Sequence, residues 1–238
     1  MGKKFLIFGA TGSIGANLAH QLYDDKKDCH LIGRNEEELK KISNKLSYTY
    51  SVCDVLKLNF IKDLLQDLTE TKILGIAYCV GSIDIKPLKL TKANDFVSSY
   101  VLNLVAVTEI IRSFQDNLKK NKGSIVLFST VAAKKGFANH SIISSAKAAV
   151  EGLTVALAAE LSPDIRINCI APSLTKSKIA SAVIKNSTIE ESIARMHPLK
   201  RIGQGVDSAN LANFLLTEKS SWITGQIIGV DGGRSNIA

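Results

Sequence analysis

Three regularly spaced glycines mark a candidate phosphate-binding loop near the start of the sequence. An apolar run at 4–9 leads into the loop, and an amphipathic stretch follows it at once. Glycines permit a tight turn, a close approach of backbone to a pyrophosphate, and close packing of a helix on a strand. The first turn of the next helix then points backbone N–H groups at the anion. The loop predicts a dinucleotide site formed by Gly9, Thr11, Gly12, Ser13, Ile14 and Gly15.

Residues that follow the next two apolar runs bear on which dinucleotide is bound. An NAD site usually has an acidic side chain after the second strand, where it holds the ribose 2′-hydroxyl. This sequence has Arg34 there, and a guanidinium suits a 2′-phosphate, although an ordinary surface arginine is the alternative. Asp54, with Val55 beside it, is expected either to hold the adenine amino group or to cap a helix. We therefore expect NADP as the cofactor, with NAD also possible.

Short apolar runs alternate with longer amphipathic stretches, and this alternation predicts the elements that position these residues. Strands are expected at 4–9, 28–33, 48–53, 73–79, 123–129, 165–170 and 226–230. Helices are expected at 13–24, 36–46, 57–67, 94–118, 141–161 and 207–217. The pattern is typical of a parallel sheet with helices on both faces, whose ligands bind beyond the carboxyl ends of the strands. We expect an α/β fold in which 1–238 form a single Rossmann-like, doubly wound domain of about seven strands.

Composition narrows the classes of partner. The chain has 238 residues, 45% of them hydrophobic, which is enough for one well-filled core. Its net charge of +8 would attract polyanions, but no basic cluster interleaved with aromatic residues appears, so we expect no nucleic acid partner. Apolar runs fall short of a membrane span and of a signal-peptide core, which favours a cytoplasmic protein without a membrane partner. The four cysteines lack metal-ligand spacing, so we expect reduced thiols and no metal site.

Further along, several segments resemble the short-chain dehydrogenase/reductase family, and the similarity covers essentially the whole chain. Segment 101–104 is similar to the one whose asparagine supports the active-site water and lysine. The run 125–129 leads to the position of the catalytic serine, and 145–153 resembles the active-site helix. Segments 165–172 and 223–233 extend the match. The resemblance implies active-site roles for Asn103, Thr130 and Lys147, and cofactor contacts for Gly81, Lys147, Pro172 and Thr175.

Departures from the family pattern are equally informative. Only Gly81 remains of the family's Asn-Asn-Ala-Gly, and its Pro-Gly becomes Pro172-Ser173. Above all, Ile143 stands where the family has the tyrosine of Tyr-x-x-x-Lys. In the family mechanism this tyrosine protonates the substrate oxygen while hydride passes from the nicotinamide. An isoleucine cannot donate that proton.

Two nearby side chains could replace the missing acid. His140 precedes Lys147 by seven residues, about two helical turns, so the two would share a face if the helix extends that far. Enoyl-thioester reductases of the same superfamily carry their tyrosine at this spacing, and histidine can donate a proton near neutral pH. The alternative for His140 is a polar residue at the helix start. Ser144 is the second candidate, and water is the third.

The leading hypothesis is an NAD(P)(H)-dependent oxidoreductase that reduces a carbonyl or an activated, enoyl-thioester-like C=C bond by hydride transfer. Asn103 and Lys147 would support the cofactor and the proton relay. Thr130 would orient the substrate, or else would only bond to nearby backbone. Because Ile143 removes the usual acid, a catalytically degenerate dinucleotide-binding protein with a structural or sensor role is the alternative.

The stretch 173–205 breaks the alternation and is long for a connection between elements. We expect a mobile lid with short helices that closes over a small-molecule substrate. The resemblance also implies a homodimer or homotetramer, built on the helices at 94–118 and 141–161 and on the last strand.

Overall fold

A seven-stranded parallel sheet runs through the middle of the molecule in the computed structural model, which describes residues 2–57 and 59–237. The strand order is β3-β2-β1-β4-β5-β6-β7, so the chain reverses its direction of progress across the sheet between the neighbours β1 and β4. Ligands of open α/β sheets bind at such a switch point. The strands are β1 Lys3–Phe8, β2 Asp28–Gly33, β3 Thr49–Val52, β4 Lys72–Tyr78, β5 Ser124–Phe128, β6 Arg166–Pro172 and β7 Ile227–Val230.

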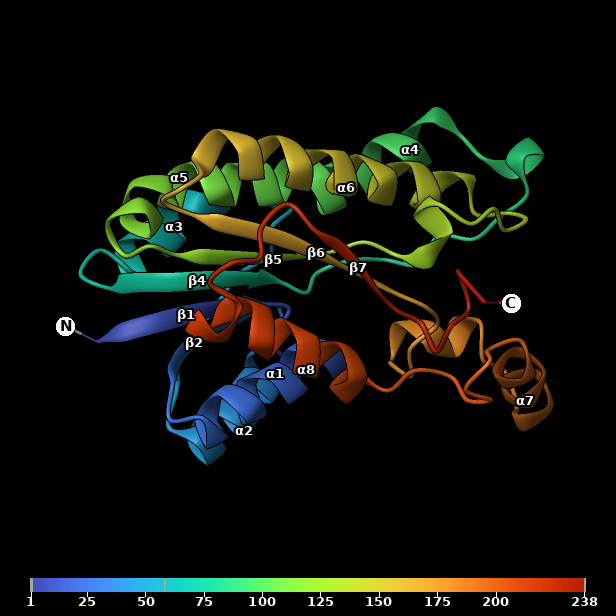
Figure 1. The fold of residues 1–238 in the computed structure, drawn as a ribbon, viewed down its shortest axis with the longest axis horizontal. Coiled ribbons are helices and arrows are strands. Elements are labelled where there is room, and N and C mark those ends of the chain that lie inside the picture. The colour runs from blue at the N-terminus through green and yellow to red at the C-terminus, as the bar shows by residue number, and fades with distance from the viewer. Residues whose placement is uncertain (1, 58, 238) are drawn as a thin grey trace.

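Helices cover both faces of the sheet (Figure 1). One layer contains α1 Ser13–Asp24, α2 Glu36–Leu46 and α8 Gly205–Leu216. The opposite layer contains α3 Phe60–Asp67, α4 Ala93–Tyr100, α5 Ala106–Lys120 and α6 Ser141–Leu161. This is the doubly wound arrangement that the alternation of the sequence predicts.

The central strand β1 shows why the two layers form. Leu6 and Phe8 belong to the core beneath α5 and α6, whereas Phe5 and Ile7 belong to the core beneath α1 and α8. All four side chains are 3% exposed or less. A strand of a parallel sheet is buried on both faces, so its sequence is continuously apolar instead of alternating. Each such burial contributes about 1.5–3 kcal/mol relative to an exposed side chain.

The helix expected at 94–118 is interrupted by one wide turn. A π-helical segment, Val101–Val105, separates α4 from α5. Its widened backbone is compensated locally, because Tyr78 Oη donates to the carbonyl of Leu102 at 2.7 Å and Asn103 Nδ2 donates to the carbonyl of Ser99 at 2.8 Å. Single π-turns of this kind occur frequently at functional sites. The prediction of one regular helix was therefore wrong at the point where Asn103 is presented.

Most other element boundaries agree with the sequence prediction. The bounds of α1, α2 and α6 are those expected, while α8 begins at Gly205, two residues early. The predicted helix 57–67 begins only at Phe60, because Asn59 has a left-handed φ of 64°. Leu58, which falls inside that prediction, lies outside the described residues.

Two helical stretches are long and apolar enough, by length and composition alone, to cross a membrane: Ala93–Lys120 and Ser141–Leu161. Both contribute buried residues to the core against the sheet, as Ile110, Phe114 and Val150 show. Core helices of soluble proteins pass the same test, so these stretches give only weak support for a membrane segment.

The expected lid contains short helices and connects strand β6 to helix α8. It carries a 3-10 turn at Ile179–Ala182 and helix α7, Ser187–Arg195. At its base Thr175 pairs with Gly203 as an isolated parallel bridge. Arg201 makes a bidentate ion pair with Asp207 in the first turn of α8, at 2.6 and 2.8 Å.

Candidate active site

The predicted site residues gather along one edge of the sheet. Parallel strands end at the same edge, so segments far apart in the sequence meet there (Figure 1). In chain order, the residues at or just after the strand ends are Gly9, Arg34, Asp54, Gly81, Thr130 and Pro172.

The glycine loop has the shape that a phosphate requires. Gly9 adopts a φ of +75°, and a methyl group there would lie 2.9 Å from the backbone carbonyl of Cys79. A methyl on Gly15 would lie 2.4 Å from the carbonyl oxygen of Gly9. Gly12 caps α1 without any side-chain hydrogen bond, and no acidic residue stands in the first turn. The N–H groups of the first turn, at Ser13 and Ile14, therefore remain available to an anion.

Directly after β2, Arg34 is exposed and forms no ion pair among the described residues. The Asp54 carboxylate accepts the N–H of Leu56 at 3.1 Å, so it closes a local turn and does not cap α3. Val55 beside it is buried. On the opposite side of the edge, lid residue Lys178 forms an ion pair with Glu38 of α2. The lid therefore reaches across to the helix that follows Arg34.

Lys147 is a buried cation in α6. Its side chain is only 7% exposed, and Nζ donates to the carbonyl of Phe128 at 2.8 Å. Burial lowers the pKa of Lys147 to about 8, against a smaller opposing effect of Cys169 and Cys79. The ammonium charge is therefore lost as pH rises through about 8, far below the ordinary range for lysine.

A small polar space separates Lys147 from Asn103. A methyl group on Gly81 would lie 3.4 Å from both Asn103 Oδ1 and Lys147 Nζ, so the bare glycine keeps this space open. Asn103 is 1% exposed, and its Oδ1 has no hydrogen-bond partner. A buried acceptor without a partner costs about 1–3 kcal/mol, so the arrangement is suited to a bound hydroxyl or water. The hydroxyl groups of a dinucleotide ribose could fill this space, so the residues present fit such a cofactor.

Thr130 lies just beyond β5. Its Oγ1 accepts the N–H of Ala132 at 3.3 Å, which leaves its own hydroxyl hydrogen for another acceptor. The neighbouring Ser129 is buried and donates to Glu151 Oε1 at 2.8 Å. The other oxygen of Glu151 lies 3.6 Å from Lys134 Nζ in the loop after β5. Ser129 and Glu151, which the sequence analysis did not select, thus fix Thr130 and the following loop against α6.

Ile143 is buried and contributes only hydrocarbon at the tyrosine position. Helix α6 begins at Ser141, so His140 is the residue that caps it and not a member of its first turn. His140 Nδ1 lies 2.7 Å from the carbonyl of Ala138, and its ring contacts Phe137 with centroids 5.5 Å apart. Because a carbonyl only accepts, Nδ1 carries a proton and Nε2 is the ring atom left for other partners. Ser144 is half-buried one turn closer to Lys147.

A serine and a histidine meet at the end of β6. Ser173 Oγ lies 2.8 Å from His197 Nε2, and His197 Nδ1 lies 2.8 Å from the carbonyl of Ile193. Thr175 Oγ1 donates to the carbonyl of Ser173 at 3.0 Å. These contacts join Pro172 and Thr175 to the lid. The departure from Pro-Gly at Ser173 was visible in the sequence, but its partner 24 residues away was not.

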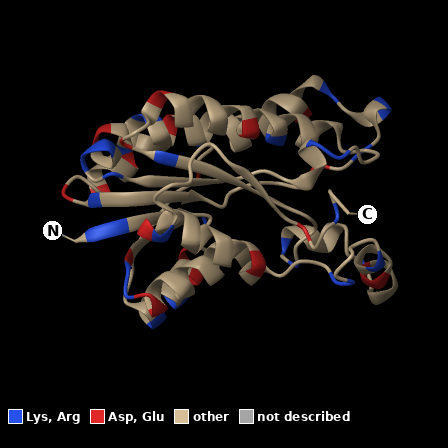
Figure 2. Ribbon diagram, viewed as in Figure 1, with Lys and Arg blue, Asp and Glu red and all other residues tan. Residues whose placement is uncertain are grey.

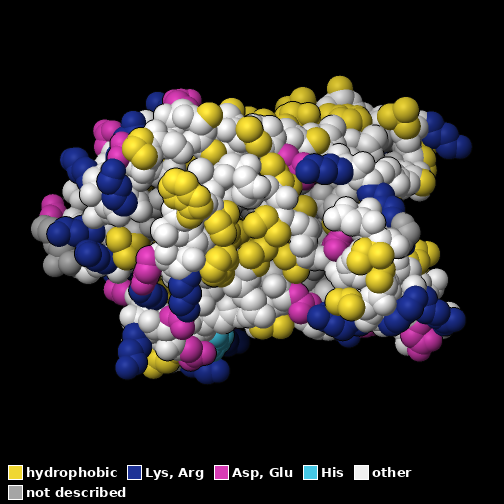
Figure 3. Space-filling view, viewed as in Figure 1, with side chains coloured by type: hydrophobic (Ala, Val, Ile, Leu, Met, Phe, Trp, Pro, Cys, Tyr) yellow, Lys and Arg dark blue, Asp and Glu magenta, His cyan; other side chains and the backbone are white. Residues whose placement is uncertain are grey.

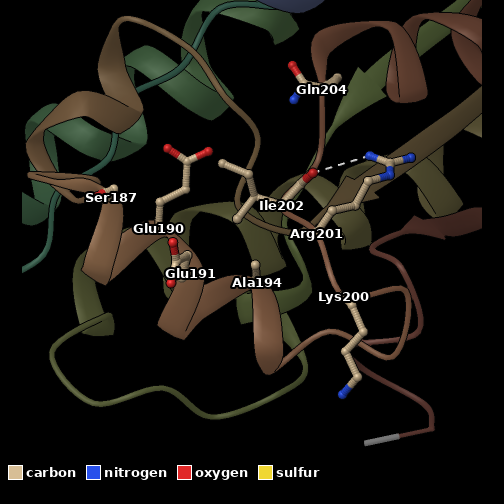
Figure 4. A pocket seen from close by; sticks show the side chains of 8 residues that line it. All are labelled: Ser187, Glu190, Glu191, Ala194, Lys200, Arg201, Ile202 and Gln204. Carbon is tan, nitrogen blue, oxygen red and sulfur yellow. Dashed lines mark hydrogen bonds between the residues drawn. The ribbon is translucent and has the colours of Figure 1, made fainter.

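A hollow on the lid lies between α7 and segment 200–204 (Figure 4). Glu190 and Ala194 form one wall, and Arg201 and Ile202 form the other, with Arg201 donating to the carbonyl of Ile202 at 3.2 Å. Lid residues and Gln204 line the hollow, and no candidate catalytic side chain does. We therefore place the active site at the sheet edge. Within the described residues no cluster of three or more His, Cys, Asp or Glu could hold a metal ion.

Comparisons with known proteins agree with this fold. The family model described as Enoyl-(Acyl carrier protein) reductase matches residues 9–235. The chain is 32% identical to a chloroplastic tropinone reductase homolog of Arabidopsis thaliana, over 98% of this chain and 76% of that protein. It is also 32% identical to the 3-oxoacyl-[acyl-carrier-protein] reductase FabG of Rickettsia bellii, over 98% and 96%. The chain therefore belongs to the short-chain dehydrogenase/reductase family of oxidoreductases.

Solved structures show the same relationship. A short-chain dehydrogenase/reductase from Mycobacterium ulcerans has a TM-score of 0.90 and 25% identity, covering 98% of this chain and 90% of that one. ElxO with NADP bound has a TM-score of 0.86 and 26% identity, covering 98% and 99%. A second structure of ElxO, in which a tyrosine is changed to phenylalanine, has NADPH bound.

The glycine loop gives a direct test of the site geometry. Gly15→Ala would place a methyl 2.4 Å from the Gly9 carbonyl oxygen, so the loop must shift. We expect the free energy of unfolding to fall by about 1–3 kcal/mol, and the affinity for a dinucleotide to fall at least about tenfold. Urea denaturation and a fluorescence titration with NADPH measure the two effects.

Gly152→Ala is the matched control, because no atom lies within 4 Å of the added methyl in the middle of α6. This variant should gain about 0.5–1 kcal/mol from helix propensity and bind NADPH as the wild type does. Equal behaviour of the two variants would contradict the close packing of α1 against the loop.

Proposed function

We propose that this protein is an NADP(H)-dependent oxidoreductase that reduces a carbonyl or an activated C=C bond. The observation that carries the proposal is the polar space between Lys147 Nζ and Asn103 Oδ1, kept open by Gly81 in an otherwise apolar interior. An unpaired buried acceptor next to a buried cation is costly unless a ligand satisfies it, which supports cofactor binding here; turnover is what separates the oxidoreductase from the non-catalytic alternative.

The cofactor would lie along the carboxyl edge of the sheet. Its pyrophosphate would bind the first turn of α1 at Thr11, Gly12, Ser13, Ile14 and Gly15. Its adenosine would lie near Arg34, Asp54 and Val55, where the unpaired guanidinium favours NADP over NAD. NADP and NADPH complexes of ElxO, the structural relative above, support this choice. NADPH supplies a hydride, and Lys147, Asn103, Pro172 and Thr175 would hold its nicotinamide ribose and carboxamide end.

Proton delivery is the step that Ile143 leaves open, and we assign it to His140. One ring nitrogen of His140 is fixed by the carbonyl of Ala138, and the other forms no hydrogen bond with the described residues. A charged imidazolium could donate the Nε2 proton to a developing oxyanion, and Thr130 could donate its hydroxyl hydrogen to the same oxygen. Lys147 adds positive charge below pH of about 8. Ser144 and water are the alternative donors.

The stretch 173–205 is proposed to act as the lid over the substrate. Its contacts reach both halves of the cleft, through Lys178 to Glu38 at the adenosine end and through His197 to Ser173 at the nicotinamide end. Closure of the lid would therefore change contacts at both ends of the bound cofactor. We propose a cytoplasmic location, as for a soluble single domain with 1–238 acting as one unit.

The proton donor can be tested by anaerobic incubation with NADPH and NADH against ketones, aldehydes and enoyl-thioesters. We expect faster oxidation of NADPH than of NADH with at least one class. His140→Phe should lower kcat by about 10²–10⁴, the usual worth of a general acid. Ser144→Ala is the matched control and should change kcat less than about threefold. Rates should fall above pH of about 8 as Lys147 loses its charge.

A rescue experiment separates loss of the donor from loss of structure. Ile143→Tyr added to His140→Phe places a phenol four residues before Lys147, on the same helix face. It should recover at least about tenfold of the lost rate. Wild-type turnover in His140→Phe would eliminate the histidine. Binding of NADPH without turnover of any compound would favour the non-catalytic alternative.

We also propose that the protein assembles into a homodimer or homotetramer. Trp222 is 99% exposed, and Val155 of α6 and Val105 beside α5 are each more than half exposed. Figure 3 shows hydrophobic side chains gathered over the middle of the face where β7 and α8 lie. Edge strand β7 has one unpaired side, which a second copy could cover.

Sedimentation velocity tests this assembly. Trp222→Ser should shift the wild-type oligomer toward smaller species, because a fully exposed indole is typical of an interface anchor. Tyr23→Ser is the control. Tyr23 is also exposed, but it lies in α1, about 200 residues before Trp222 in the sequence, and this variant should sediment as the wild type does. A monomeric wild type would contradict the proposal.

A further inference from the structure

The six arginines of the chain divide into two groups by what holds their charge. Arg112, Arg195 and Arg201 pair with carboxylates, of Glu109, Glu191 and Asp207. Arg166 donates to a set of acceptors at the end of α8, namely Ser220 Oγ and the carbonyls of Leu215, Thr217 and Ile223. Arg34 and Arg234 form no ion pair among the described residues. Arg34 already has a role in the proposed cofactor site. Arg234 is therefore the unpaired arginine to which no role has been assigned.

Among the described residues, only neutral groups contact the Arg234 guanidinium. One terminal nitrogen donates to the carbonyl of Met196 at 2.9 Å, and the other lies 3.3 Å from the Met196 sulfur. The guanidinium carbon stands 5.5 Å from the centre of the Phe137 ring. A guanidinium has five N–H groups, so these contacts fix its position and leave donors and a full positive charge available.

Among the described residues, Asp231, the nearest acidic residue along the chain, forms no ion pair with Arg234. The Asp231 carboxylate accepts the backbone N–H of Gly233 at 2.9 Å and of Ser235 at 2.8 Å, together with the Ser235 hydroxyl. Burial alone would raise the pKa of Asp231, but these hydrogen bonds outweigh it and hold the pKa below its ordinary value. Asp231 thus shapes the turn that presents Arg234 and stays ionised, with its oxygens engaged by the donors of that turn.

Three segments that border the substrate side of the site converge on Arg234. Phe137, beneath the guanidinium, contacts the ring of His140 at 5.5 Å between centroids. Met196 directly precedes His197, which holds Ser173 beside the cofactor edge. In Figure 2 the ribbon is blue at Lys and Arg positions on the loop after β5, on the lid and near the end of the chain. Arg234 therefore stands at the border between the candidate acid and the lid.

We propose that Arg234 is a binding residue for an anionic group on the substrate, so that the preferred substrate carries a carboxylate or phosphate besides its reducible bond. The inference rests on the proposed function for the location of the reacting bond, but not for the anion site itself. A planar guanidinium held by neutral contacts matches an oxyanion through two parallel hydrogen bonds. The two unpaired arginines would then mark the two ends of one cleft, Arg34 for the cofactor and Arg234 for the substrate.

Calorimetric titration of the protein saturated with NADP⁺ tests the anion site without turnover. The probes are butyrate, inorganic phosphate and butyramide, which has the shape of butyrate without its charge. Butyrate or phosphate should bind at least about tenfold more tightly than butyramide, as a charge-assisted pair requires. Arg234→Ala should abolish this difference, and Arg234→Lys should retain part of it. Arg112→Ala, which removes an ion-paired surface arginine, should change nothing.

Each outcome decides the matter. Tighter butyrate indicates a carboxylate substrate, and tighter phosphate indicates a phosphorylated one. Equal binding of all probes, no binding of any, or a preference that survives Arg234→Ala would overturn the inference. Activity assays separate it from the proposed function: NADPH oxidation with neutral ketones but no anion preference refutes only the anion site. An Arg234-dependent anion site without any NADPH oxidation refutes only the oxidoreductase.

Discussion

A buried ammonium group is the constraint on which the rest of the site depends. Lys147 is surrounded by the ends of β4, β5 and β6, yet the described residues give its Nζ one hydrogen bond, to the carbonyl of Phe128. Burying a charge is costly unless its donors are satisfied. The remaining donors face the same small space as the unpaired Asn103 Oδ1. A polar ligand such as a dinucleotide ribose would satisfy both groups.

The surrounding fold can be understood as the support for that pair. Asn103 reaches the space because the π-turn rotates it out of the regular helical register, with Tyr78 and Ser99 compensating for the widened backbone. Gly81 keeps the space open because any side chain there would fill it. Helix α6 brings Lys147 in, and His140 lies at the N-cap position, one residue before the helix begins. The chemistry that remains to be supplied is the proton, since Ile143 offers none.

Local sequence patterns predicted most of the fold, and with it the sheet edge at which the candidate cofactor residues lie. Apolar runs and helical periodicity arise from burial against the sheet, so they located all seven strands and the exact bounds of α1, α2 and α6. The π-turn at Val101–Val105 could not be predicted, because the hydrophobic periodicity of the helix continues through it. Contacts between segments far apart in the sequence could not be predicted for a different reason. Ser173 with His197, and Arg234 with Phe137, join residues that only the tertiary fold brings together, and no spacing rule records them.

Hydride transfer is the central claim, and isotope transfer from the cofactor tests it most directly. The protein would be incubated with NADPH carrying deuterium at both C4 positions and a panel of 3-oxo and enoyl compounds, and the products analysed by mass spectrometry. The account predicts one deuterium on the reduced carbon of at least one product, with transfer abolished in Lys147→Ala. Tight binding of NADPH with no deuterium in any product would contradict it.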